Sequence, residues 1–142
     1  MRALRLAFTV VELTITLSIV AVLSAIAIPW AGHLLNRMHV RGAVLEIESG
    51  FAVARHIAIA RSALATVDID TTAGVMRVSV GPDTLRTIRV GTDHDVRLSA
   101  TRVQMSYSAT GMGYGAANLS VVARRSAAVD TVFVSRLGRL RH

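Results

Sequence analysis

The feature that most constrains this chain is an apolar run close to its start, residues 8–28, with the sequence FTVVELTITLSIVAVLSAIAI. Glu12 is the only charged residue in this run, and Pro29 follows the run directly. A helix that crosses a bilayer needs roughly 20 mainly apolar residues at about 1.5 Å of rise per residue. The run therefore predicts a helix that is attached to a membrane or passes through one.

Composition limits what the rest of the chain can be. Behind the apolar run, about 110 of the 142 residues remain, enough for one modest domain. The formal net charge is +7, and every basic residue is Arg. Guanidinium groups suit polyanions. Because the arginines are spread along the whole chain, however, a general bias in amino-acid usage explains them better than a dedicated binding surface does. The absence of Cys excludes disulfides, thiol catalysis and Cys-based zinc sites.

The residues alone leave three interpretations of the N-terminal segment open. Arg2 and Arg5 with the apolar core and Ala25-Ile26-Ala27 fit a secretory signal cleaved after Ala27. A permanent membrane anchor fits equally, as does processing between Ala7 and Phe8 with the apolar helix retained. Glu12 bears on this choice, because a carboxylate inside an apolar helix is unfavourable unless it snorkels or meets a positive partner.

Residues 8–13, FTVVEL, resemble the start of type IV pilin-like proteins, whose usual pattern is Gly followed by Phe-Thr-Leu-x-Glu and a hydrophobic residue. The resemblance implies that a prepilin peptidase cuts between Ala7 and Phe8 and methylates the new N-terminus. It also implies that Glu12 pairs with the amine of a neighbouring subunit during assembly. Ala7 stands where the family usually has Gly, and Pro29 falls where the family places a helix-bending proline.

This resemblance predicts a domain organisation and a location. Residues 1–7 are expected to form a cytoplasmic leader, and residues 8–29 the half of a helix that spans the inner membrane and later lies in a filament core. Residues 30–142 are then an extracytoplasmic, periplasmic domain of a single-pass protein. The expected partners are other pilins or pseudopilins, the prepilin peptidase, an inner-membrane assembly platform and the membrane itself.

The pattern after Pro29 changes from helix to strand. Apolar residues including Leu34, Met38, Leu45, Phe51 and Leu64 recur at spacings compatible with one face of a helix over residues 30–65. Within residues 66–142 the period becomes two, with strands expected at 75–80, 85–90, 96–100, 103–107, 119–123 and 131–135 and turns at 81–84 and 91–93. We expect an α+β, pilin-like fold in which one long helix packs on an antiparallel β-sheet domain.

Motifs for catalysis or cofactors are weak. The glycine-rich residues 111–115 lack a following helix that would bind phosphate, and residues 93–95, Asp-His-Asp, do not match a known cation loop. His33, His39 and His56 lack the spacing of a zinc helix. No nucleophile elbow is present. We therefore expect a protein that is not an enzyme and that has no cofactor or metal.

The C-terminal segment carries the remaining signal. Arg136, Arg139 and Arg141 lie close to the end of the chain, and Gly138 permits an unusual backbone angle. In an extended segment Arg139 and Arg141 would point to the same side, where two guanidinium groups suit a phosphodiester backbone. Residues 138–141, Gly-Arg-Leu-Arg, resemble the C-terminal Gly-Arg-x-Arg motif of the GspH/FimT group of pilin-like proteins. Residues 54–67 are similar to that group's Ala-Arg…Ala-Ile…Val segment, and residues 103–111 to its strand-then-glycine segment before the last hairpin.

The GspH/FimT resemblance implies a structural function with two branches. The first is a minor pseudopilin of a type II secretion system, assembled at or near the tip of the pseudopilus, and this is the favoured hypothesis. The alternative is a FimT-like minor type IV pilin that binds DNA through Arg136, Gly138, Arg139 and Arg141. A second alternative, independent of this family, is a secreted soluble binding domain cleaved after Ala27.

Overall fold

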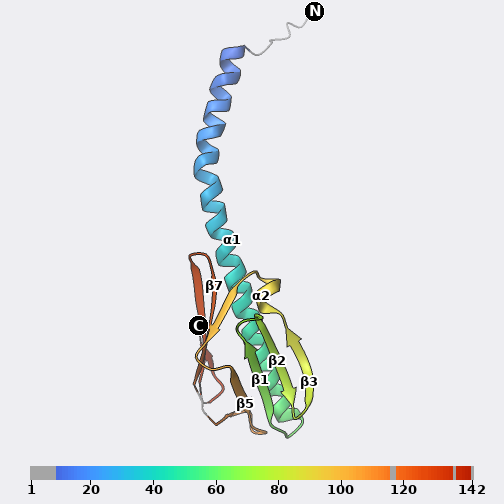
Figure 1. Ribbon diagram of the computed structural model, residues 1–142. Helices are drawn as coiled ribbons and strands as arrows, with labels where there is room; N and C mark the ends of the chain where they lie inside the picture. Colours follow the sequence, from blue (N-terminus) through green and yellow to red (C-terminus); the bar gives the residue numbers. More distant parts are fainter. Residues whose placement is uncertain (1–8, 116–117, 136, 142) are drawn as a thin grey trace, which may run out of the picture. The chain divides into compact units, whose positions relative to one another are not determined.

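A computed structural model of the chain describes residues 9–115, 118–135 and 137–141. These residues form two compact units, which divide between Leu34 and Leu35. One helix, α1 (Val10–Ala60), contributes to both units, and in the described part of the chain the second unit adds a short helix and nine strands. Figure 1 shows α1 as one continuous coil, with the strands gathered beside its later turns.

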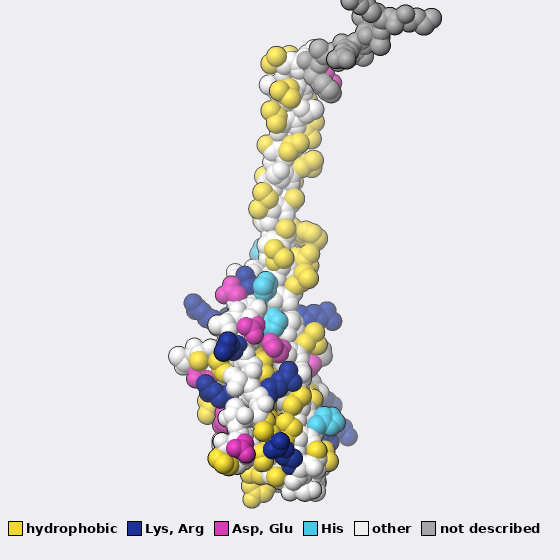
Figure 2. Space-filling model, turned by 90° about the vertical axis from the view of Figure 1, so that its right-hand side faces the viewer, with side chains coloured by type: hydrophobic (Ala, Val, Ile, Leu, Met, Phe, Trp, Pro, Cys, Tyr) yellow, Lys and Arg dark blue, Asp and Glu magenta, His cyan; other side chains and the backbone are white. Residues whose placement is uncertain are grey.

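In the first unit, α1 is apolar on every side and unburied. Its large apolar side chains between Val10 and Ile28 are 54–78% exposed to solvent. Figure 2 shows apolar side chains along this part of the helix, whereas most of the charged side chains in view lie on the second unit. This stretch is long and apolar enough to cross a membrane, and it is a candidate membrane anchor.

In the second unit, α1 buries a narrow stripe in which half of the residues are Ala or Gly. The buried residues recur at intervals of three and four, as on one helical face: Val40, Ala43, Val44, Ile47, Gly50, Phe51, Ala54 and Ala58. Of the apolar residues that predicted the buried face, Phe51 is buried and Ile57 packs against the core, but the leucines and Met38 were wrongly placed on it. Leu34, Met38, Leu45 and Leu64 are 45–62% exposed, because small side chains let the sheets approach the helix more closely than leucines would.

The helix ends five residues earlier than predicted. Ala63 N–H donates to the Ala58 carbonyl at 3.1 Å, and Ser62 N–H donates to the Ile59 carbonyl at 3.2 Å. Ser62 has a φ of 48°, so this is a Schellman termination with serine in the left-handed position that glycine usually takes. The predicted boundary at residue 65 was wrong because the sequence has no glycine there to mark the end.

The strands form two antiparallel sheets. The larger has the order β3-β2-β1-β5-β6 and contains β1 (Ala65–Asp70), β2 (Val75–Val80), β3 (Asp83–Ile88), β5 (Gln104–Tyr107) and β6 (Gly113–Tyr114). The smaller has the order β4-β7-β8-β9 and contains β4 (Arg97–Ala100), β7 (Leu119–Arg125), β8 (Ala128–Val134) and β9 (Leu140–Arg141). The long helix on antiparallel sheets confirms the predicted α+β, pilin-like fold.

Individual elements match the sequence pattern unevenly. The strand predicted at 75–80 has the bounds of β2, whereas β1 was missed as a separate strand although the change of period near residue 66 was seen. The turn predicted at 91–93 is wrong, because a short helix, α2 (Val90–Asp93), occupies it. Val90 is fully buried there, and, like Ile88 two residues before it, it points into the core.

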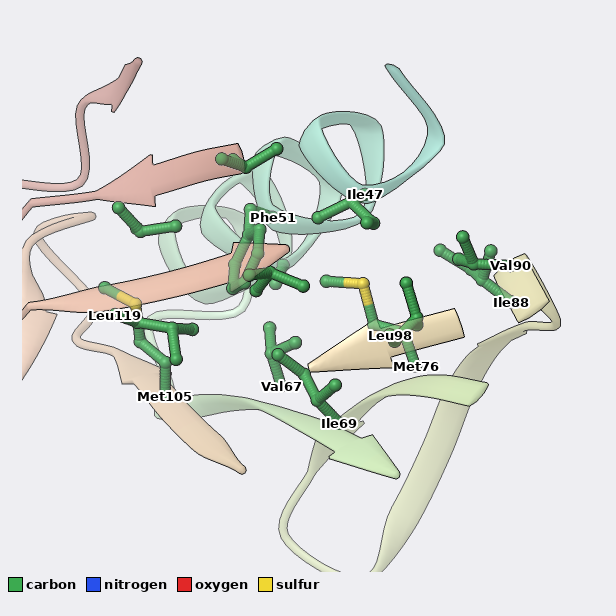
Figure 3. Close-up of a cluster of buried hydrophobic side chains, with 14 of the residues drawn as sticks. Ile47, Phe51, Val67, Ile69, Met76, Ile88, Val90, Leu98, Met105 and Leu119 are labelled. Carbon is green, nitrogen blue, oxygen red and sulfur yellow. The ribbon is translucent and has the colours of Figure 1, made fainter. Parts of the chain in front are cut away.

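The core of the second unit lies between the stripe of α1 and the inner faces of the sheets. Figure 3 shows Ile47 and Phe51 of α1 directed toward side chains of the sheets, among them Val67 and Met76. Phe51, Val67 and Val78 have no exposed surface, and Met76 is 1% exposed. Burial of this apolar surface is the main source of stability for the unit.

A polar cluster secures one end of this packing. His94 Nε2 lies 2.9 Å from Glu46 Oε2 of α1, and the imidazole ring sits where a side chain on Gly42 would otherwise be. Arg125 donates to Asn36 Oδ1 at 2.9 Å and forms an ion pair with Asp95 at 3.1 Å. His94 and Asp95, from the segment considered above for a cation, thus link helix and sheet.

Candidate functional site

The N-terminal site begins at the first described residue, Thr9. Its hydroxyl accepts a hydrogen bond from the Glu12 backbone N–H at 3.1 Å, and its carbonyl accepts one from Leu13 N–H at 3.1 Å. Thr9 is therefore the N-cap of α1, and Glu12 is the acidic residue of the first turn. Ala7 and Phe8, the predicted processing site, lie outside the described residues.

Glu12 has an exposed side chain in the single chain. A carboxylate three residues after a Thr cap is the sequence of a capping box, and its negative charge is stabilised by the N-terminal end of the helix dipole. This local interaction is available to Glu12 before any partner binds. The interaction with the helix dipole keeps the Glu12 carboxylate at the start of α1, which is also where a contact with the amine of another subunit would need it.

Three hydroxyl groups of the apolar segment donate hydrogen bonds within the helix. Thr14 donates to the Val11 carbonyl at 2.8 Å, Thr16 to the Leu13 carbonyl at 2.8 Å, and Ser18 to the Thr14 carbonyl at 2.7 Å. These bonds remove the penalty that unpaired hydroxyls would incur in hydrocarbon. The segment can therefore occupy either a bilayer or a packed helical core without new hydrogen-bond partners at these positions.

The C-terminal site is the short strand β9. It pairs with β8 in the register Phe133 with Arg141 and Val134 with Leu140. Arg139 and Arg141 are exposed while Leu140 between them packs against the core, so the two arginines lie on the same side as the alternation predicted. Arg136 lies outside the described residues.

Gly138 positions β9. Its φ is +70°, and an added Cβ would lie 3.1 Å from the Gly111 carbonyl oxygen and 3.2 Å from Cε1 of Tyr107. The turn is closed by hydrogen bonds from Ser135 N–H to the Arg139 carbonyl at 2.9 Å and from Gly138 N–H to the Ser135 carbonyl at 2.8 Å. A side chain at 138 would therefore strain the backbone directly before Arg139 and crowd Gly111 and Tyr107.

Arg139 and Arg141 line two hollows, one on each side of β9. The larger has a volume of about 760 Å³, and its wall also includes Arg102, Phe133 and Leu137. We call this hollow the Phe133 groove; its full lining is Thr101, Arg102, Asn118, Leu119, Ser120, Phe133, Val134, Ser135, Leu137, Arg139 and Arg141. None of these lining residues carries a negative charge, so the groove suits an anion.

The smaller hollow, of about 370 Å³, lies between β9 and α1. Its lining contains Arg55 and His56 of the helix, in addition to Arg139 and Arg141, and again no Asp or Glu. Tyr107 forms part of its wall, and burial raises the pKa of this phenol to about 12, while the positive charge of Arg55 acts in the opposite direction. The phenol thus stays neutral and adds no negative charge to the hollow at neutral pH.

The structure adds residues that the sequence reasoning missed. Arg55 and Arg102 are distant in sequence from the Gly-Arg-Leu-Arg segment, and the fold brings them to it, whereas Phe133 lies five residues before Gly138. The alternation of β8 was a usable signal for Phe133, because Val132 and Val134 are buried and Phe133 must then point outward. Nothing local to Arg55 or Arg102 marks them.

The described part of the chain shows no group of three or more side chains suited to holding a metal ion. Of the histidines considered, His56 lines the smaller hollow beside three arginines, and His94, in the segment considered for a cation, contacts Glu46.

Helix, sheets and register together define a pilin-like fold. Solved structures with this fold include the type IV minor pilin FimU of Pseudomonas aeruginosa, with a TM-score of 0.64 and 13% identity over 74% of this chain and 88% of FimU. A second crystal form of FimU gives a TM-score of 0.61 at 12% identity, over 71% of this chain and 90% of that one.

A secretion protein shares the fold as well. The minor pseudopilin EpsH from the type 2 secretion system of Vibrio cholerae has a TM-score of 0.56 and 10% identity, over 72% of this chain and 94% of EpsH. No protein-family model matches the sequence. Comparison with curated proteins likewise finds no sequence match. The likeness therefore lies in the fold, which pilus and secretion subunits share.

Proposed function

We propose that this chain is a minor subunit of a pilin-type filament, held in the inner membrane before assembly and packed through the same helix afterwards. The observation that carries the proposal is the unburied apolar segment of α1, joined in one helix to a domain of pilin-like fold. Residues 1–7 are then the leader removed by a prepilin peptidase, and Phe8 is the methylated N-terminus. The domain after Pro29 lies outside the cytoplasm.

Mass spectrometry of the mature N-terminus tests this proposal. We expect the mature chain to begin at Phe8 and to carry a methyl group. A chain that begins at Ile28 would instead support a secreted soluble domain and would remove the filament proposal. An Ala7→Gly variant is the matched control, because it restores the residue that the pilin pattern has before the cut and should be processed at the same bond.

Glu12 is proposed to contact the N-terminal amine of a neighbouring subunit. Its place in the first turn of α1 supports this, because the carboxylate is exposed and lies next to the expected new N-terminus. We expect Glu12→Gln to insert into membranes normally and to be incorporated into filaments less than the wild type. Thr9→Ala is the control, because it removes the cap but leaves the carboxylate; equal incorporation of the Glu12→Gln and wild-type proteins would contradict the contact.

The type of filament is the finer part of the proposal. The first candidate is the type II secretion pseudopilus, which the GspH-like resemblance implies and with which the shared fold of EpsH agrees. Deleting the gene in the source organism should then retain secreted enzymes in the periplasm and leave pili unaffected. Normal secretion together with a loss of pili or of DNA uptake would reject this candidate.

A minor pilin that binds DNA is the second candidate, and one observation favours it. Arg139 and Arg141 stand exposed between two hollows that contain further arginines and no carboxylate in their linings. Phosphate contacts of this kind give affinity that falls with salt. We expect Arg139→Ala with Arg141→Ala, in the full chain in neutral detergent, to bind DNA at least tenfold more weakly and with a flatter salt dependence.

The matched control removes two other exposed arginines. Arg77→Ala with Arg86→Ala changes the net charge equally, but these residues lie on β2 and β3 of the other sheet. It should bind DNA nearly as well as the wild type. If both double variants weaken binding equally, the binding reflects net charge alone and the second candidate fails.

A further inference from the structure

The Phe133 groove combines features that a purely electrostatic surface does not need. Phe133 is 56% exposed and Leu137 is 57% exposed, and both line the same hollow as Arg102, Arg139 and Arg141. The other described phenylalanine, Phe51, is fully buried. An aromatic ring left in water beside three guanidinium groups indicates a ligand with both a negative charge and an apolar, planar part.

The register of the smaller sheet sets these groups in one row across its outer face. Thr101 N–H donates to the Ser120 carbonyl at 3.0 Å, Ser120 is opposite Phe133, and Phe133 is opposite Arg141. Directly opposed side chains on one face lie roughly 5 Å apart at Cβ. The small Ser120 side chain leaves open space on one side of the ring, and Arg141 flanks its other side.

Residues adjacent to this row complete the pattern. Arg102 follows Thr101 along the chain, and Arg139, directly before β9, lies two residues before Arg141, which places these two arginines roughly 7 Å apart along the extended segment. The groove thus presents positive charges on both sides of one aromatic platform. A polymer with a negative charge and a planar face at every step matches this alternation, as in proteins that bind single-stranded nucleic acid.

We infer that the Phe133 groove binds single-stranded nucleic acid, with one base stacked on Phe133 and the flanking phosphates held by Arg102, Arg139 and Arg141. The inference rests on the second candidate function and goes beyond it, because a duplex keeps its base faces stacked internally and cannot offer one to Phe133. Duplex DNA could meet the arginines alone. The groove therefore discriminates between single and double strands through the ring, not through the charges.

Fluorescence anisotropy with the full chain in neutral detergent tests this, using a labelled 20-nucleotide single strand and the corresponding duplex. Phe133→Ala should weaken binding of the single strand by about tenfold and leave duplex binding unchanged. The slope of affinity against salt should not change, since no charge is removed. Val129→Ala is the control, because Val129 is a 46% exposed residue of the same strand, opposite Arg124 and outside the groove lining.

Phe133→Trp provides a direct readout of stacking. This variant should retain single-strand binding, and the indole fluorescence should be quenched by the single strand and not by the duplex. The single natural tryptophan, Trp30, gives the background, which the wild-type protein measures. Quenching of equal size with both nucleic acids would overturn the inference.

The outcomes separate this inference from the function on which it rests. Suppose that the variant with Arg139→Ala and Arg141→Ala loses DNA binding, while Phe133→Ala binds the single strand as the wild type does. The DNA function then stands and the inference is wrong. If the wild type binds neither nucleic acid, both are wrong. Displacement of the single strand by polyglutamate at equal charge concentration would also overturn the inference, since an acidic peptide would then serve as well as a nucleic acid.

Discussion

The two parts of α1, before and after residue 34, show how one helix can serve two environments. The earlier part carries large apolar side chains on all sides and buries none of them in the chain itself, as with Ile19 at 54% exposure. The later part buries a narrow stripe that includes Ile47 at 1% exposure, and it leaves other large apolar side chains outside, such as Met38 at 62%. Apolar residues in the first part are therefore available to lipid or to other subunits, whereas those of the stripe already stabilise the domain.

The comparison predicts that the same substitution, Ile to Ala, strongly destabilises the domain in the later part of α1 and has almost no effect on it in the earlier part. Ile47→Ala removes a fully packed side chain and should lower the free energy of unfolding of the domain by about 2–5 kcal/mol. Ile19→Ala should change it by less than about 0.5 kcal/mol, because its neighbours lie outside the chain. Urea denaturation of the full chain in detergent micelles, followed by near-ultraviolet circular dichroism, measures both. A comparable loss in the Ile19 variant would show that the earlier part also supports the domain.

Tyr107 reports on the packing of the later part through pH. Its pKa is raised to about 12 by burial, and the unfolded value is about 10. The folded state therefore keeps its proton after the unfolded state has lost it, and stability should be fully present below pH 10 and fall by up to about 1.4 kcal/mol per unit of pH above it. The chain has no Lys or Cys, so few other side chains titrate there.

Denaturation curves recorded between pH 9 and 11.5 measure this slope. Tyr107→Phe should remove it, although the variant also loses whatever the hydroxyl contributes at neutral pH. Tyr114→Phe is the control, because Tyr114 is 65% exposed and should leave the slope intact. A slope that persists in the Tyr107 variant would assign the alkaline instability to another group.

The sequence was informative where one physical requirement acted alone. The apolar segment, the strand at 75–80 and the outward pairing of Arg139 and Arg141 follow from length and period. The sequence was misleading at the helix end, where Ser62 adopts a left-handed conformation without glycine, and at the buried stripe, where Ala54 and Ala58 face the core in preference to Leu45. Which side chains of α1 are buried depends on how closely the sheets approach the helix, and no local sequence pattern contains this information.

The residues of the candidate site also divide into those that the local sequence could predict and those that it could not. Gly138, Arg139 and Arg141 are adjacent in sequence, so a short motif could indicate them. Arg55 and Arg102 reach the two hollows lined by Arg139 and Arg141 only because α1 and the β4–β5 connection pass beside β9 in the fold. Their contribution depends on tertiary structure, and a single sequence offers no spacing that would reveal it.

The smallest expected effect compares the two parts of α1 through their glycines. An added Cβ at Gly32 would meet nothing within 4 Å, so Gly32→Ala should leave domain stability unchanged and favour the helix by up to about 1 kcal/mol locally. At Gly50 the Cβ would lie 2.9 Å from Cδ1 of Ile88 and from Cε of Met76, both buried. Overpacking of about 1–3 kcal/mol there exceeds the gain in helix propensity, so Gly50→Ala should be less stable than Gly32→Ala by roughly 1 kcal/mol. Parallel denaturation of the two variants measures this difference. Equal midpoints would mean that Met76 and Ile88 move aside without a loss of stability, and that the stripe is packed less tightly than its burial implies.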